Sequence, residues 1–203
     1  PLLANIFKEA QSWGQAANHK NWYEGVLEGR SHTPRYTPKQ REGDSRPAAL
    51  RAIVLYPMNA LVEDQMARLR EALDSTSVRT FMTTHFKGNR FYFGGYNGDT
   101  IAKKNYDLIS EAVNNGQITN GKLNQMRQNV AKQLKSYQDD FTKIKKWVEV
   151  NKKEDALYIS PRLEADDTTA EMITRWDMQK WAPDIMITNT SMLSIMLMRK
   201  AEA

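Results

Sequence analysis

The chain has 203 residues, with 29 lysines and arginines against 24 aspartates and glutamates, and a formal net charge of +5. Because the two signs of charge are interspersed, this mild excess favours nucleic acid as a partner only weakly. The absence of cysteine and the three scattered histidines exclude a disulfide framework, argue against a zinc site and favour a cytoplasmic location, and no apolar run approaches the ~20 residues of a membrane span.

The first part of the chain combines a helical pattern with a polar segment. Apolar residues at spacings of three and four predict a helix over residues 1–18, with Pro1 tolerated in its first turn. Residues 19–49 contain several glycines and prolines without a sustained period, which predicts a long loop. The abrupt start of the helix leads us to expect a piece of a longer protein.

Short β-favouring runs then alternate with helical patterns. Residues 52–56 (AIVLY) are typical of a strand buried on both faces of a parallel sheet, and residues 78–82, 90–96 and 184–188 are predicted as further strands. Helices are predicted over about residues 60–73 and 192–198. Strands separated by helices in this order predict an α/β fold with a mainly parallel sheet.

Residues 101–182 have a different, helical character. From Leu123 to Val148 the apolar residues step by three and four, which predicts one long helix. A shorter helix over residues 101–113, turned at residues 114–116, is its natural partner. We therefore expect a helical hairpin inserted into the sheet domain, which divides the chain into residues 1–100, 101–182 and 183–203.

Two strand-to-helix junctions look alike. Tyr-Pro-Met-Asn at residues 56–59 precedes one predicted helix, and Thr-Asn-Thr-Ser at residues 188–191 precedes another. Ligands gather at the carboxyl ends of parallel strands, where the first-turn N–H groups of the next helix are unpaired and its dipole is positive. The junctions therefore suit a phosphate, with Asn59 and either Asn189 or Thr190 as helix caps. The alternative is that they are ordinary helix caps.

Three stretches resemble, in order, motifs of superfamily 2 helicases. Residues 57–70 (PMNALVEDQMARLR) are similar to the motif after the second strand of the first RecA-like domain, residues 96–100 (YNGDT) to the Y-x-G-D-T motif, and residues 184–193 (DIMITNTSML) to the T-N-x-x-M-L motif upstream of the Walker B acid. With residues 175–178 (RWDM), they resemble in particular the DrmA-like helicases of DISARM anti-phage systems. The resemblance covers roughly residues 50–100 and 170–200, and more loosely the first helix.

The resemblance implies part of a first RecA-like motor domain, between the Walker A and Walker B motifs, in an ATP-driven motor that grips single-stranded or partly duplex nucleic acid, with DNA favoured. The backbone-binding residues that it implies are Pro57, Asn59, Gly98, Asp99, Thr100, Thr188 and Asn189. A Walker A loop, a D-E-x-H motif and a second motor domain are absent from the sequence. ATP and Mg²⁺ are therefore expected in the full-length parent, and the chain alone is expected to bind neither and to be inactive.

The predicted insertion carries nine lysines and arginines against four acids over residues 121–154. Such a face could follow a phosphate backbone through Lys135, Lys145 and Lys146, with Tyr137 or Trp147 stacking on a base. A solvated helix face is the alternative. Two other functions stay open, namely a nucleic-acid-binding module without a motor cycle and a scaffold whose helical insertion docks a partner protein of a defence complex.

Overall fold

The structure is a computed structural model that describes residues 2–16, 19–20, 33–42, 44, 46–57, 59–164 and 169–198. Its strands are β1 (Ala52–Tyr56), β2 (Phe93–Tyr96) and β3 (Ile185–Asn189). They form one sheet in the order β1-β3-β2, and both pairings are parallel. The predicted α/β fold with a parallel sheet is therefore confirmed.

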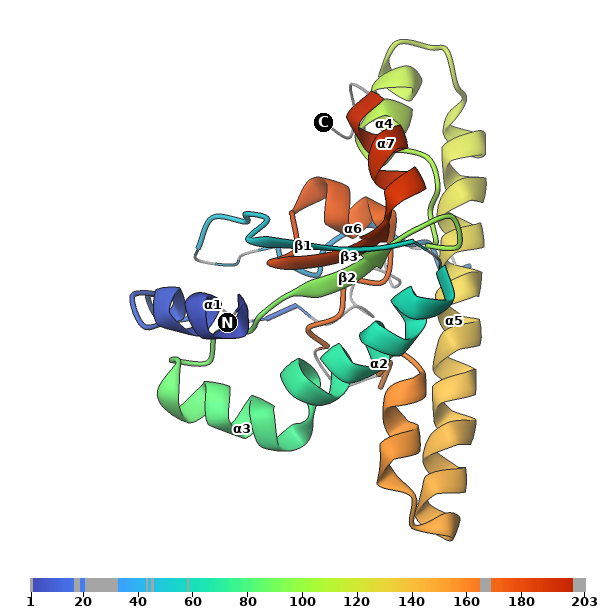
Figure 1. The fold of residues 1–203 in the computed structure, drawn as a ribbon. Coiled ribbons are helices and arrows are strands. Elements are labelled where there is room, and N and C mark those ends of the chain that lie inside the picture. Colours follow the sequence, from blue (N-terminus) through green and yellow to red (C-terminus); the bar gives the residue numbers. More distant parts are fainter. Residues whose placement is uncertain are drawn as a thin grey trace.

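Helices cover both faces of this sheet. They are α1 (Leu2–Ala10), α2 (Asn59–Asp74), α3 (Thr76–His85), α4 (Tyr106–Asn114), α5 (Asn120–Asn151), the 3-10 helix η2 (Glu154–Ile159), α6 (Arg175–Lys180) and α7 (Thr190–Met198). Figure 1 shows α1, α2 and α3 below the sheet, α6 and α7 above it, and the long α5 running past its right-hand end. The sheet is thus the middle of three layers.

The central strand β3 is buried on both faces. Ile185 and Ile187 pack into the core that α1, α2 and α3 cover, whereas Met186 packs into a second core with Met178 and Met192. This alternation follows from the two-residue period of a strand. In contrast, Ile53 and Leu55 of β1 are 44% and 45% exposed, so the prediction that β1 is buried on both faces is wrong.

Residues 78–82, predicted as a strand, lie in helix α3, so this prediction is wrong. Val78 and Met82 face the same core at a spacing of four, which is a helical period. Thr80, the one threonine of this segment, is exposed and donates its hydroxyl to the carbonyl oxygen of Thr76 one turn earlier. Helix α3 follows α2 after Ser75 alone, and Ser75 is its N-terminal flanking residue.

The described part of the 19–49 segment packs into the domain. Tyr36, Gln40 and Arg41 are each at most 2% exposed. The side-chain amide of Gln40 donates to the carbonyl oxygens of Thr169 (2.8 Å) and Glu171 (2.7 Å). This part of the predicted loop therefore joins segments that are far apart in the sequence.

Helices α4 and α5 form the predicted pair of a short and a long helix. Gly116, with φ of 72°, lies in the turn between them, and the Thr119 hydroxyl caps α5 by accepting from the N–H of Lys122. The 32 residues of α5 extend over ~48 Å at 1.5 Å per residue. Its Val130 and Leu134 pack in a third core with Trp176. Of the helices described, none is long and apolar enough to cross a membrane.

Candidate nucleic-acid interface

The three motif-bearing junctions meet at the carboxyl end of the sheet. Tyr56, the last residue of β1, is aligned with Asn189 of β3, and Tyr96, the last residue of β2, is aligned with Thr188. Because all three strands are parallel, the segments that follow them emerge on the same side. The structure therefore brings together Pro57, the 97–100 turn and the start of α7.

The turn at residues 97–100 is closed by its own side chains. The Asn97 Oδ1 atom accepts hydrogen bonds from the backbone N–H groups of Asp99 (2.9 Å) and Thr100 (3.2 Å). The Thr100 hydroxyl donates to the carbonyl oxygen of Gly95 (2.7 Å). Asp99 is exposed at the tip, and a Cβ atom at Gly98 would have no neighbour within 4 Å. Gly98 and Asp99 thus present backbone to solvent on a fixed turn.

Arg175, the first residue of helix α6, contacts this turn. The Arg175 guanidinium donates to the carbonyl oxygen of Asn97 (2.6 Å) and lies 4.8 Å from the centroid of the Tyr96 ring. The backbone N–H of Arg175 donates to the carbonyl oxygen of Ile101 (3.0 Å), and the residue is only 3% exposed. The RWDM stretch therefore has a structural role, because its Arg175 fixes the position of the YNGDT turn.

The remaining predicted residues differ in accessibility. Thr188 is fully buried, and its hydroxyl donates to the carbonyl oxygen of Tyr96 (2.5 Å), so this side chain positions β2 and does not face solvent. Asn189 is half-buried and accepts from the N–H of Met192 (2.6 Å), which makes it the predicted cap of α7. Pro57 is exposed. Asn59 begins α2, and its side chain lies outside the described residues.

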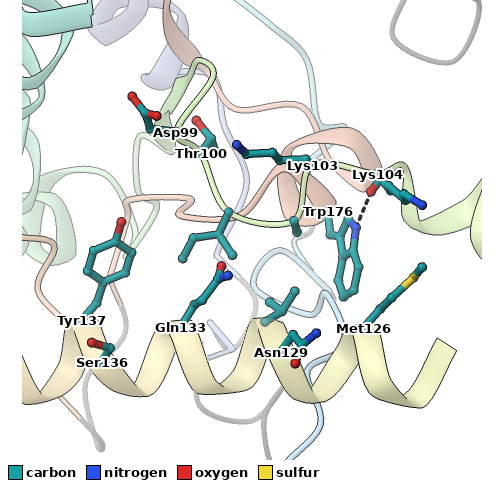
Figure 2. Close-up of a pocket in the computed structure, with 13 residues that line it drawn as sticks. Asp99, Thr100, Lys103, Lys104, Met126, Asn129, Gln133, Ser136, Tyr137 and Trp176 are labelled. Carbon is teal, nitrogen blue, oxygen red and sulfur yellow. Dashed lines mark hydrogen bonds between the residues drawn. The ribbon is translucent and has the colours of Figure 1, made fainter. Parts of the chain in front are cut away.

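A groove of about 600 Å³ opens between the 99–104 segment and α5. Figure 2 shows the α5 side chains of Asn129, Gln133, Ser136 and Tyr137 along one wall, with Lys103 and Lys104 on the opposite side. Buried apolar side chains, Ile101, Val130 and Trp176, also line it. Asp99 and Thr100 line it too, so the groove is continuous with the carboxyl end of the sheet. An apolar interior with polar and basic walls is typical of a ligand site.

The segment that carries the two lysines is held at both ends. Ile101 forms a parallel bridge with Thr174, and the Trp176 indole N–H donates to the carbonyl oxygen of Lys104 (2.5 Å). Between these points Ala102 has φ of 66°, in the left-handed region that costs a non-glycine residue about 1 kcal/mol. Lys103 and Lys104 are exposed. The backbone of this segment is therefore fixed while both amines stay accessible.

The groove wall also includes a tyrosine with a perturbed pKa. Partial burial, together with the nearby carboxylates of Glu63, Glu171 and Asp99, raises the pKa of Tyr137 above its ordinary value. Its phenol, like that of an ordinary tyrosine, is protonated at neutral pH and can donate a hydrogen bond. Tyr137 also lines a smaller neighbouring cavity of about 200 Å³ beside Arg70.

The lysines predicted on α5 do not line this groove. Lys135 pairs with Asp139 (3.2 Å), and Lys145 pairs with Glu164 (3.2 Å). Lys145 and Lys146 follow Ser136 by nine and ten residues, which places them ~13–15 Å further along the helix. The structure therefore places Lys145 and Lys146 away from the groove, while Lys135, next to Ser136, does not line it.

Sequence reasoning named Asp99, Thr100 and Tyr137, which line the groove, but it missed four other lining residues, Lys103, Lys104, Asn129 and Gln133. Lys103 and Lys104 fell in the segment predicted as a helix, and Asn129 and Gln133 lay among the polar positions of the long helix. A spacing of four from Asn129 to Gln133, and of four again to Tyr137, places them on one helical face. This four-residue spacing was the sequence signal that identifies them, because it predicts an uncharged polar stripe along one face of the helix.

Two buried ion pairs brace the elements around the site. Arg70 of α2 donates to both carboxylate oxygens of Glu171 at 2.8 Å, and both residues are at most 5% exposed. Asp184, fully buried before β3, accepts from Arg46 (2.7 Å) and Arg51 (2.6 Å). Such bidentate pairs fix orientation because the planar guanidinium matches the carboxylate.

Within the described residues, no group of three or more His, Asp and Glu side chains could hold a metal ion. No protein-family model matches the sequence, and no solved structure matches it. The chain is similar to Druantia protein DruE of Escherichia coli (strain UMEA 4076-1), with 31% identity over 170 residues that cover 75% of this chain. The chain spans 9% of the length of that relative.

Proposed function

We propose that the chain is part of an ATP-dependent superfamily 2 helicase or translocase of phage defence, and that the carboxyl end of its sheet binds the backbone of nucleic acid, with DNA favoured. The observation that carries the proposal is the convergence of Pro57, the 97–100 turn and the start of α7 at that end of one parallel sheet. The similarity to a Druantia protein, a defence-system protein, supports the phage-defence role.

The chemistry of this surface suits phosphate and sugar. Helices α2 and α7 both begin there, and the positive ends of their dipoles attract phosphate. Gly98 presents backbone without a side chain in the way. A motor moves over any sequence, so it binds the backbone and not the base edges.

ATP and Mg²⁺ belong to other parts of the parent protein in this proposal. The 203-residue chain lacks the phosphate loop and the metal-binding acids that supply nearly all of the catalysis of phosphoryl transfer. The test compares ATP turnover by the full-length parent and by this chain, each with and without single-stranded DNA. We expect turnover that DNA stimulates in the parent only. A parent whose turnover ignores DNA would contradict the proposal.

A second candidate function concerns residues 101–182, the predicted insertion. It is the binding of a partner protein in a defence complex. Trp147, Val150 and Ile159 lie near the C-terminal end of α5 and in η2, and they are 48%, 80% and 68% exposed. Helices α5 and η2 contact each other, and large apolar side chains that are exposed on neighbouring elements favour a protein contact. Crosslinking of the full-length protein inside its native complex, compared with a Val150→Asp/Ile159→Asp variant, tests this role. Loss of a specific crosslink supports it, and an unchanged pattern contradicts it.

A further inference from the structure

We infer that the groove between the 99–104 segment and α5 takes an unpaired nucleotide of a nucleic-acid strand, so that α5 forms a second wall of the nucleic-acid path. This inference rests on the proposed function and adds to it a site, a substrate form and the residues that contact it. The groove opens beside Asp99 and Thr100, so a strand that follows the carboxyl end of the sheet reaches it directly.

The distribution of charge sets the orientation of the nucleotide. Lys103 and Lys104 are exposed on the side of the turn, and Figure 2 shows the Lys103 amine directed toward Thr100. The Lys104 amine points the other way in Figure 2, so each amine meets its own phosphate of the strand, where charge is complementary. The other part of the groove, lined by Tyr137, Val130 and Ile101, offers no positive charge. The base therefore occupies that part of the groove.

The α5 wall suits an unpaired base. The side-chain amides of Asn129 and Gln133 are exposed and hydrogen-bond with no other described residue. Because an amide both donates and accepts, they are free to bond with the edge of any base without selecting a sequence. The Tyr137 ring, 38% exposed, offers a surface for stacking. Val130 and Ile101 give the groove an apolar interior. A base that is paired in a duplex has its Watson–Crick edge occupied and its faces stacked, so this wall selects single strands.

Matched pairs of variants test this inference in the full-length protein. Tyr137→Ala is compared with Trp147→Ala, because both residues are exposed aromatics of α5 and only Tyr137 lines the groove. Lys103→Ala/Lys104→Ala is compared with Lys135→Ala/Lys146→Ala, which removes the same charge elsewhere. Fluorescence anisotropy with a labelled single-stranded oligonucleotide and with a matched blunt duplex gives each Kd at three salt concentrations.

We expect Tyr137→Ala to weaken single-strand binding by at least about five-fold, because stacking on an aromatic ring contributes this much or more per base. Duplex binding should change much less. Lys103→Ala/Lys104→Ala should lower the salt slope for single strands by ~0.7 for each phosphate that the two amines neutralise in the unmodified protein. The Trp147 and Lys135/Lys146 controls should bind like the unmodified protein.

The outcomes separate this inference from the proposed function. If Gly98→Ala weakens single-strand binding while the Tyr137 and Lys103/Lys104 variants bind normally, the groove is not part of the path and the inference is overturned. An equal loss in the controls, or an equal loss on duplex, overturns it too. If the unmodified protein binds no nucleic acid, or only a partner protein, the proposed function fails and the inference fails with it.

Discussion

The guanidinium of Arg175 donates a 2.6 Å hydrogen bond to the carbonyl oxygen of Asn97, across 78 residues of sequence. Two stretches that the sequence suggested separately, RWDM and YNGDT, are therefore one structural unit. The 97–100 turn is shaped by its own hydrogen bonds, and Arg175 fixes its position relative to α6.

Replacing Arg175 should therefore affect both stability and binding. Arg175→Ala removes a buried hydrogen bond from a charged donor, which typically contributes about 1.5–3 kcal/mol, and the interaction with the Tyr96 ring. We expect the free energy of unfolding, measured by urea titration of the 203-residue chain, to fall by about 2 kcal/mol. Single-strand affinity of the full-length protein should fall as the turn loses its position. An unchanged urea midpoint in Arg175→Ala would contradict this prediction, because it would mean that the contact of Arg175 with the turn does not stabilise the fold.

The ion pair between Arg70 and Glu171 gives a second prediction. Arg70→Met leaves the Glu171 carboxylate buried and unpaired, which should lower the free energy of unfolding by about 3–5 kcal/mol. The Arg70→Met/Glu171→Leu double variant should be less destabilised than Arg70→Met, because no isolated charge is left inside. The same urea titration measures both, and a double variant at least as unstable as the single one would refute this account of the pair.

The buried carboxyl of Asp177 predicts a dependence of stability on pH. Burial raises the pKa of Asp177 above its ordinary value, although the hydroxyl groups of Tyr36 and Thr174 donate to it. Between the unfolded pKa of about 4 and the raised folded pKa, unfolding releases a proton, so the free energy of unfolding falls as the pH rises through this range.

Asp177→Asn should lack this fall, because an amide does not titrate. Urea titrations of both chains at a series of pH values from about 4 upward give the difference between them, in which the other carboxylates cancel. The free energy of unfolding of the unmodified chain minus that of Asp177→Asn should decrease with rising pH and then level off above the raised pKa of Asp177. A difference that is independent of pH would mean that Asp177 titrates alike in the folded and unfolded chains.

Local patterns predicted those elements whose burial follows a single period. The continuous apolar run of β3 and the three-and-four spacing from Leu123 to Val148 correspond to the central strand and to α5. Residues 78–82 misled because threonine and valine favour strands locally, whereas the packing of Val78 and Met82 into one core requires a helix. Tertiary packing therefore determined the secondary structure of residues 78–82.

The site was only partly predictable for a related reason. The junctions at Pro57, Gly98 and Asn189 could be recognised because each lies at the end of a strand or within two residues after it. The groove joins Lys103 to Gln133, 30 residues apart, and depends on which face α5 turns toward the 99–104 segment. Net charge along α5 pointed instead to Lys135, whose charge is paired with Asp139.

The most direct test of the central claim is the single-strand affinity of the full-length protein after Gly98→Ala. The added Cβ atom meets no protein atom within 4 Å and the backbone needs no left-handed conformation there, so folding is unaffected, but the methyl group covers the surface offered to phosphate. Gly14→Ala is the control, because a Cβ atom there also meets nothing within 4 Å and Gly14 lies beyond α1, away from the 97–100 turn.

Anisotropy with mixed-sequence and homopolymer single strands at three salt concentrations provides the measurement. We predict equal affinity of the unmodified protein for both strands, and a several-fold loss on both in Gly98→Ala, with the salt slope unchanged because no charge is removed. Gly14→Ala should bind normally. Unchanged affinity in a folded Gly98→Ala protein would contradict the claim that the carboxyl end of the sheet binds nucleic acid.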